Sequence, residues 1–189
     1  MHKILIVGDS ISMGYTPTVA AELAGVAEVV HNPGNGGDSS NVISGIGEWI
    51  AEARPDVVTL NCGLHDIKRE KATRLCQVPL DFYKMILPVV IDKIRSAGCR
   101  AVWVNTTPVI EKRHQAVKPF GRYNKDVDAY NKAAGDVARK AGLPVINLHK
   151  AAGDLGLERA LADDGAHFTA DAYEALGRKV AARLREMLQ

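Results

Sequence analysis

The chain has 189 residues and a mass of 20.4 kDa, which predicts a single domain spanning residues 1–189. Hydrophobic residues make up 47% and charged residues 24%, a balance that excludes disordered, collagen-like and disulfide-dense chains. The formal net charge is only +2 and aromatic residues make up 5%, so the composition predicts no nucleic-acid partner.

Short runs of branched apolar residues alternate along the chain with longer runs of helical periodicity. The first strand is predicted over Lys3–Val7. A helix then begins at Thr16, because a threonine followed by proline is typical of a helix start. The second strand is predicted over Val26–His31, and the next helix is capped by Ser39 or Ser40 and ends before a proline.

The same alternation continues through the middle of the chain. A third strand is predicted over Asp56–Asn61 and a third helix over Phe82–Ala97. Pro88 indicates either a kink in this helix or a later start. The fourth strand is predicted over Arg100–Thr106, where the near-continuous apolar run is typical of a strand covered on both faces.

The last third of the chain predicts two more helices and one more strand. An apolar face at helical spacing runs from Val127 to Ala141 and ends at a glycine. The fifth strand is predicted over Pro144–Leu148, and Thr169 caps a final helix. Alternating strands and helices predict an α/β fold, with a parallel sheet covered by helices on both faces.

Ligands of such folds bind beyond the carboxyl ends of the strands, so we expect the functional residues in the loops at that edge. Directly after the first strand stands the tripeptide Gly8-Asp9-Ser10. A serine at this place is a nucleophile if a base reaches it, and otherwise it caps a helix. We expect Asp9 to support the loop through hydrogen bonds.

A second candidate element lies just before the last helix, where Asp164 precedes His167 by three residues. Histidine is a natural general base near neutral pH, and a carboxylate on its other nitrogen would orient the ring. The alternative is an exposed acidic turn followed by a histidine at the helix entry.

Two further loops complete the edge of the predicted sheet. Residues 32–39 are rich in glycine, so backbone N–H groups can approach a developing oxyanion, although a plain loop is also consistent. Residues 61–66 follow the third strand and bring a polar side chain, Asn61 or His65, to the same edge.

These four elements, in this order, resemble the SGNH hydrolases, also called the GDSL esterase family, over the whole chain. The resemblance implies a three-layer α/β/α sandwich with a flavodoxin-like, doubly wound sheet of five parallel strands. It implies that Ser10 is the nucleophile and that Asp164 and His167 complete a catalytic triad. It also places an oxyanion-hole donor at Gly37, the glycine before an aspartate, beside the Ser10 amide.

The third family block usually reads G-x-N-D, with an asparagine that donates to the oxyanion, whereas this chain has His65 at that position. A neutral imidazole has one N–H donor and an imidazolium has two, so His65 can still complete the oxyanion hole. Two alternatives stay open: the Ser10 and Gly37 amides act without it, or the site hydrolyses esters poorly.

The resemblance implies a serine esterase that needs no metal or cofactor, but it does not choose the substrate. Because the compact chain has no apolar lid segment, we expect short acyl esters, such as acetyl esters of a carbohydrate or small molecule. Lysophospholipases and thioesterases of the same family are alternatives, as are a noncatalytic ligand-binding module and a nucleotide- or flavin-binding module. Thr107 at a strand end and Arg113 and Arg122 in a basic loop are candidates for substrate contacts, although a solvated loop is also consistent.

Cysteine content and the first residues bear on the compartment. The three cysteines form no C-x-x-C pair, which predicts inert thiols rather than disulfides or a metal site. A strand begins almost at once, and no apolar run approaches the roughly 20 residues of a membrane span. We therefore expect a cytoplasmic protein, or a secreted one whose signal peptide is absent from this sequence.

Overall fold

Five short parallel strands form the central sheet of the computed structural model, which describes residues 1–188, and their order is β2-β1-β3-β5-β7. The strands are β1 (His2–Val7), β2 (Ala27–His31), β3 (Val57–Leu60), β5 (Arg100–Val104) and β7 (Val145–Ile146). The chain starts in the middle of the sheet, extends to one edge and then crosses back to the other. This is the doubly wound arrangement that was predicted.

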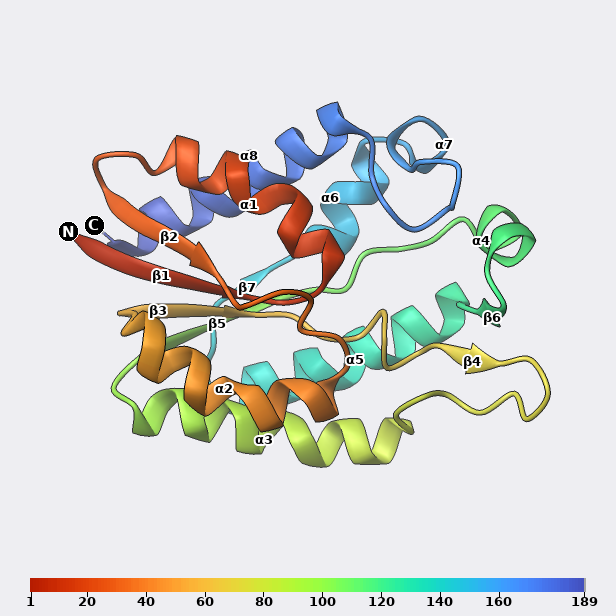
Figure 1. The fold of residues 1–189 in the computed structure, drawn as a ribbon, viewed down its shortest axis with the longest axis horizontal. Coiled ribbons are helices and arrows are strands. Elements are labelled where there is room, and N and C mark those ends of the chain that lie inside the picture. The colour runs from red at the N-terminus through yellow and green to blue at the C-terminus, as the bar shows by residue number, and fades with distance from the viewer. Residues whose placement is uncertain (189) are drawn as a thin grey trace.

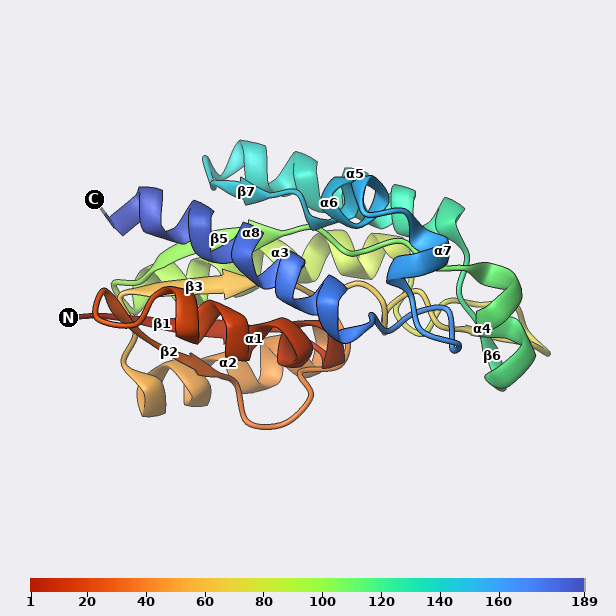
Figure 2. The same cartoon turned by 90° about the horizontal axis from the view of Figure 1, so that it is seen from above.

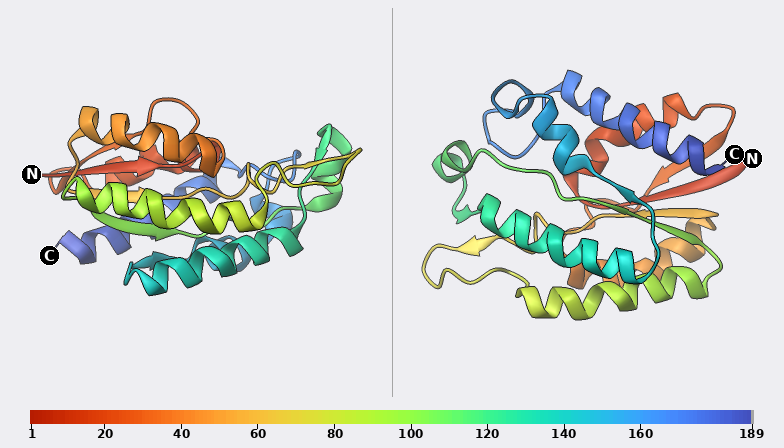
Figure 3. Two further views of the ribbon diagram at one scale, coloured as in Figure 1. Left: turned by 90° about the horizontal axis from the view of Figure 1, so that it is seen from below. Right: turned by 180° about the vertical axis from the view of Figure 1, so that it is seen from behind.

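Helices cover both faces of this sheet (Figure 1). One layer consists of α1 (Ser10–Glu22), α6 (Leu148–Asp154) and α8 (Ala170–Leu188). The other consists of α2 (Ser39–Ala53), α3 (Leu80–Ser96) and α5 (Asn124–Lys140). The predicted three-layer α/β/α sandwich is confirmed. The view from above looks onto α1 and α8 in front of the sheet, and the view from behind shows the two helix layers on opposite sides of it (Figures 2 and 3).

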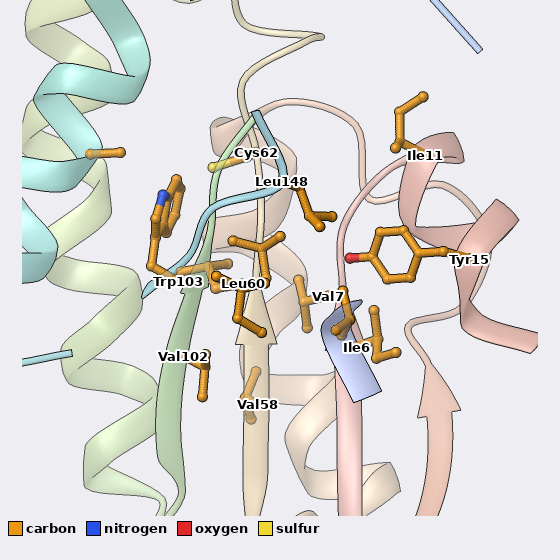
Figure 4. Packing of buried hydrophobic residues seen from close by; sticks show 14 of the residues in the cluster. Ile6, Val7, Ile11, Tyr15, Val58, Leu60, Cys62, Val102, Trp103 and Leu148 are labelled. Carbon is orange, nitrogen blue, oxygen red and sulfur yellow. The ribbon is translucent and has the colours of Figure 1, made fainter. Parts of the chain in front are cut away.

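The core lies between the strands and the two helix layers, because both faces of the sheet are covered. All four residues of β3 are buried, and so is Trp103 of β5, which pairs with Leu60 in the register of the two strands. Figure 4 shows these side chains packed with those of β1 and α1. Cys62 is also buried, which raises the pKa of its thiol and disfavours the reactive thiolate.

The first helix begins earlier than predicted, at Ser10 rather than at Thr16. Asp9 caps it, since its Oδ1 accepts a hydrogen bond of 2.9 Å from the amide of Ile11. The earlier start is favoured because the longer helix buries an apolar face formed by Ile11, Tyr15 and Val19. Pro17 consequently lies inside the helix, and Ser10 becomes its first residue.

Other predicted boundaries move by a few residues. Asp38 caps α2 in place of Ser39 or Ser40, with its Oδ1 accepting from a first-turn amide at 3.0 Å. The third helix begins at Leu80, so Pro88 lies within it and does not delay its start. Both caps and prolines are local signals that packing of the whole helix can override.

Several short elements escaped prediction because they lie in segments read as loops. They are β4 (Arg69–Glu70), β6 (Phe120–Gly121), α4 (Glu111–Val117) and α7 (Leu157–Ala160). The predicted strand Pro144–Leu148 is shorter than expected, because Leu148 already begins α6. The strands β4 and β6 pair antiparallel and form a small second sheet.

These additional elements gather beyond the carboxyl ends of the central strands (Figure 1). The amino terminus and the last turns of α8 lie at the opposite end of the sheet (Figures 1 and 3). Within residues 1–188, no helix combines the length and the apolar character needed to span a membrane. The extra elements therefore frame the edge at which the candidate catalytic residues lie.

Candidate active site

The structure brings together three residues that the sequence places far apart. Ser10 Oγ lies 2.8 Å from Nε2 of His167, and Nδ1 of His167 lies 2.6 Å from Oδ2 of Asp164. An ionised carboxylate only accepts hydrogen bonds, so Nδ1 carries the ring proton and Nε2 is free to accept from the serine hydroxyl. This proton arrangement is the one that a general base needs.

The turn before α8 holds the carboxylate of Asp164 in place. Its Oδ1 accepts hydrogen bonds from the amides of Ala166 at 3.0 Å and His167 at 2.9 Å. Burial alone would raise the pKa of Asp164, but these amides and the His167 ring outweigh it and hold the pKa well below the usual range. Asp164 is therefore ionised near neutral pH.

A second serine–histidine pair lies two residues further along α1. Ser12 Oγ is 2.6 Å from Nε2 of His31, whose Nδ1 bonds to the Asn32 carbonyl at 2.8 Å. Ser12 is 1% exposed, whereas Ser10 is only partly buried. A substrate can reach Ser10 and not Ser12, and His31 has a peptide carbonyl where His167 has a carboxylate.

The glycine-rich loop approaches the nucleophile through its backbone. Gly36 N donates to Gly8 O at 2.9 Å, and a Cβ on Gly36 would come within 2.6 Å of that oxygen, so only glycine fits. Asn32, which was not predicted as a site residue, holds the same turn because its Oδ1 accepts from Gly8 N at 2.9 Å. Both contacts fix the loop beside the start of α1.

The predicted oxyanion donor Gly37 has a φ of 67°, a conformation that favours glycine. Its amide donates to Asn35 Oδ1 at 2.9 Å, so an oxyanion would have to displace or share this side chain. The amide of Ser10, at the first position of α1, has no acceptor within its own helix. A helix start is a favourable place for a developing negative charge.

His65 is held by a contact that the sequence did not reveal. Nζ of Lys68 lies 2.9 Å from Nδ1 of His65, and an ammonium has only donors, so Nδ1 accepts and Nε2 carries the proton. Burial, aided by the nearby cations Lys68 and Arg122 and opposed by Asp9, lowers the pKa of His65 to about 4. His65 is thus a neutral ring with a single donor.

This neutral state leads to a prediction for the pH dependence. Above about pH 5 His65 no longer titrates, so His65→Asn should leave the shape of the kcat/KM profile unchanged and its height within about tenfold. His65→Ala, which has no donor, should lose about 10²–10³ in kcat. Stopped-flow or steady-state assays with an activated acetyl ester from pH 5 to 9 measure both. An altered acid limb in His65→Asn would contradict the neutral-donor role.

Asp66 is the next residue in the chain, but its contacts stabilise the fold. It is fully buried, and its Oδ1 accepts from the amide of Ser39 at 3.0 Å and from its hydroxyl at 2.5 Å, which ties the third loop to α2. Burial raises the pKa of Asp66 to about 7, against the lowering effect of the Ser39 hydrogen bonds. The carboxyl is thus protonated over much of the acid range.

The raised pKa of Asp66 makes stability depend on pH. In the unfolded chain this carboxyl ionises near pH 4, at about 3.9. Between that value and about 7 the folded state retains a proton that the unfolded state has lost, so the free energy of unfolding falls as the pH rises.

Asp66→Asn cannot ionise and should lack this decline. Relative to wild type it should gain up to about 1.4 kcal/mol per pH unit between pH 4 and 7, a few kcal/mol in all. Urea unfolding at pH 4.5, 6 and 8 measures the difference. Parallel curves for the two proteins would show that Asp66 does not titrate in this range.

The remaining predicted contact residues lie in different surroundings. Thr107 is 2% exposed and lines a cavity of about 10 Å³ with Ile11 and Leu64. Arg113 pairs with Glu158 at 2.7 Å, a structural contact that leaves little of its charge for a substrate. Arg122 is 6% exposed and donates through Nε to Leu64 O at 2.7 Å, directly beside His65.

Two wider clefts lie elsewhere on the described part of the structure. One of about 420 Å³ lies along the β4–β6 sheet and is lined by residues that include Lys68, Gln77 and Phe120. Another of about 530 Å³ lies between α3 and α5 and contains none of the candidate catalytic residues. Within residues 1–188, no group of three histidine, cysteine or acidic side chains could hold a metal ion.

Comparison with known proteins identifies the family to which this site belongs. A model of the GDSL-like lipase/acylhydrolase family matches residues 6–175. The chain belongs to this family. The acylhydrolase is accordingly an enzyme that cleaves ester bonds, and the predicted resemblance is confirmed. A search of curated protein sequences finds no match.

Solved structures support the fold of this acylhydrolase. A lipase/acylhydrolase from Enterococcus faecalis superposes with a TM-score of 0.83 and 23% identity, covering 100% of this chain and 98% of that one. An acetyl xylan esterase from Geobacillus stearothermophilus gives a TM-score of 0.79 at 20% identity, covering 98% and 94%. At these identities the likeness shows a shared fold and leaves the substrate open.

Proposed function

We propose that this acylhydrolase cleaves short-chain carboxylic esters, such as acetyl esters of a carbohydrate or small molecule, through a triad of Ser10, His167 and Asp164. The observation that carries the proposal is the hydrogen-bonded chain of 2.8 Å and 2.6 Å that links the three side chains. It ends on a serine that solvent can reach, at the carboxyl edge of a parallel sheet.

In the proposed reaction His167 takes the proton of Ser10 as Oγ attacks the ester carbonyl. Asp164 orients the imidazole and stabilises the imidazolium that forms. His167 then protonates the departing alkoxide, and a water activated by the same ring hydrolyses the acyl-enzyme. Every proton transfer runs through Nε2 of one histidine, and the ring returns to its starting state.

The oxyanion would face donors from three loops in the same proposal. The Ser10 amide comes from the start of α1, the Gly37 amide from the glycine-rich loop and the Nε2–H of His65 from the third loop. A neutral imidazole donor replaces the asparagine amide that this family usually has at that position. Because Lys68 fixes the ring tautomer, the donor is already in place before substrate binds.

A short acyl group is favoured by the kind of enzyme that shares this fold. The internal cavity of about 10 Å³ is lined by buried residues that include Ser12 and Tyr15 and by none of the candidate catalytic residues, so it does not define the acyl pocket. The presence of acetyl xylan esterases among similar structures is consistent with this choice.

A panel of p-nitrophenyl esters from acetate to decanoate, together with acetylated sugars, tests the acyl preference. We expect kcat/KM to be highest for acetate and to fall steeply with each added methylene group. An optimum at eight or more carbons would favour the lysophospholipase and thioesterase alternatives.

A fluorophosphonate probe tests the activation of the serine independently of the substrate. Labelling requires an activated hydroxyl, so the probe should modify the peptide that contains Ser10 and leave Ser10→Ala unmodified. Labelling elsewhere, or none at all in folded protein that has no esterase activity, would support a noncatalytic binding module.

A further inference from the structure

Two cations stand beside the candidate oxyanion hole without an acidic partner. Arg122 is 6% exposed and Lys68 is partly buried. Within residues 1–188, neither side chain has a carboxylate within ion-pairing distance; their contacts are the Leu64 carbonyl and the His65 ring, respectively. Buried charges are normally paired, because removing a charge from water is costly.

The two cations also share an aromatic surface. The Arg122 guanidinium and the Lys68 ammonium each lie 5.3 Å from the centre of the Phe120 ring. Cation–π contacts offset only part of the lost hydration. Burial lowers the pKa of both side chains, and their mutual repulsion adds to the effect on Lys68. The cluster is therefore incomplete without a negative charge.

The nearby carboxylates are committed to other tasks. The aspartates that act on these cations at longer range are Asp9, Asp38, Asp66 and Asp164. Their respective hydrogen-bond partners are the Ile11 amide, the Asn41 amide, Ser39 and His167. Although Oδ2 of Asp9 and Oδ2 of Asp66 have no hydrogen-bond partner among the described residues, none of these four aspartates forms an ion pair with Arg122 or Lys68.

A cleft beside the cluster has room for a ligand. Lys68 and Phe120 line the cleft of about 420 Å³ along the β4–β6 sheet. Gln77, on another wall, bonds to Asp38, the residue after Gly37, so the cleft borders the oxyanion loop. The cleft contains one carboxylate, Glu70, whose Oε2 accepts from Thr73 Oγ1 at 3.0 Å in the β4 turn.

We propose that the ester substrate carries a negatively charged group, a carboxylate, phosphate or sulfate, on its alcohol portion, and that Arg122 binds this group beside Lys68. The alcohol portion is specified because the proposed acyl group is acetyl, whose methyl group offers no position for a charge. The inference rests on the proposed esterase function. It identifies the substrate class as acetyl esters of acidic alcohols.

A matched pair of esters tests this inference at low ionic strength. The first is 4-acetoxybenzoate and the second its uncharged analogue 4-acetoxybenzamide, which differ in the charge at one position. Wild type should hydrolyse the anion with a kcat/KM at least about tenfold higher, and added NaCl should shrink the ratio because salt screens charge. A phosphate in place of the carboxylate shows which anion is preferred.

Two variants assign the preference to one side chain. Arg122→Gln should reduce the ratio of the two kcat/KM values to near one, and the ratio is informative even if both values fall. Lys112→Gln removes an exposed charge from α4, in the same basic stretch of the sequence, and should keep the ratio. If Arg122→Gln does not fold, competitive inhibition of wild type by 4-hydroxybenzoate, compared with 4-hydroxybenzamide, measures the same preference.

The outcomes separate this inference from the proposed function. A ratio near one in wild type, or equal losses on both esters in Arg122→Gln, would overturn the anion site. The second result would mean that Arg122 acts on the oxyanion, which both esters share. Hydrolysis of both esters by Ser10→Ala would instead overturn the proposed function itself.

Discussion

Replacing Ser10 with alanine should lower kcat for an activated acetyl ester by on the order of 10⁶-fold while the protein remains folded. Among the described residues, the Ser10 hydroxyl is the only group close to His167 Nε2 that could form the acyl-enzyme. Its Oγ lies 2.8 Å from that nitrogen. Because Ser10 is the first residue of α1 and Asp9 provides the cap, alanine should preserve the helix. Steady-state kinetics and a thermal melt measure the two effects.

Ser12→Ala is the matched control for this variant. It removes a hydroxyl from the same helix that also lies close to a histidine, at 2.6 Å. We expect activity within roughly tenfold of wild type, since Ser12 is sealed from solvent and its histidine has no carboxylate partner. If Ser12→Ala were inactive and Ser10→Ala active, the nucleophile would belong to the second pair.

The succession of strands and helices along the chain, and the sheet edge at which the candidate site lies, could be predicted from apolar patterns, and there is a physical reason. A parallel sheet covered on both faces requires continuous apolar runs, which stand out in a sequence. It also brings the carboxyl ends of its strands to one edge, so residues as distant as Ser10 and His167 are expected to meet. The residue types in the loops that follow these strands therefore indicate the chemistry of the site.

The contacts that set the state of each group were not predictable in the same way. Lys68 lies three residues after His65, yet only the turn between them shows that its ammonium fixes the ring tautomer. Arg122 approaches the same loop from a distant part of the chain through the Leu64 carbonyl. Such contacts depend on tertiary packing, for which hydrophobic periodicity holds no signal.

The short elements and the start of α1 were not predicted correctly, for a related reason. The two-residue strands β4 and β6 form hydrogen bonds with each other although they lie far apart in the sequence, and neither has an apolar pattern of its own. The Thr16–Pro17 signal for a helix start is a local preference, and it lost to the Asp9 cap because the longer helix buries more apolar surface.

Asp164→Asn should lower kcat for the same ester by about 10⁴-fold with little change in KM. Asparagine can still accept from the Ala166 and His167 amides through Oδ1, so the turn should keep its shape. Its Nδ2 then faces Nδ1 of His167 and donates to it, which moves the ring proton to Nε2. In that tautomer the histidine cannot accept the proton of Ser10.

Asp163→Asn provides the comparison, because it removes one negative charge from the adjacent, exposed position. Asp163→Asn should retain activity near that of wild type if Asp164→Asn acts by changing the tautomer of His167 and not by changing the net charge. Fluorophosphonate labelling should slow in Asp164→Asn in parallel with kcat, since both reactions need the same proton transfer. Equal kinetics in the two variants would show that the carboxylate does not control the base, even though it lies 2.6 Å from the ring.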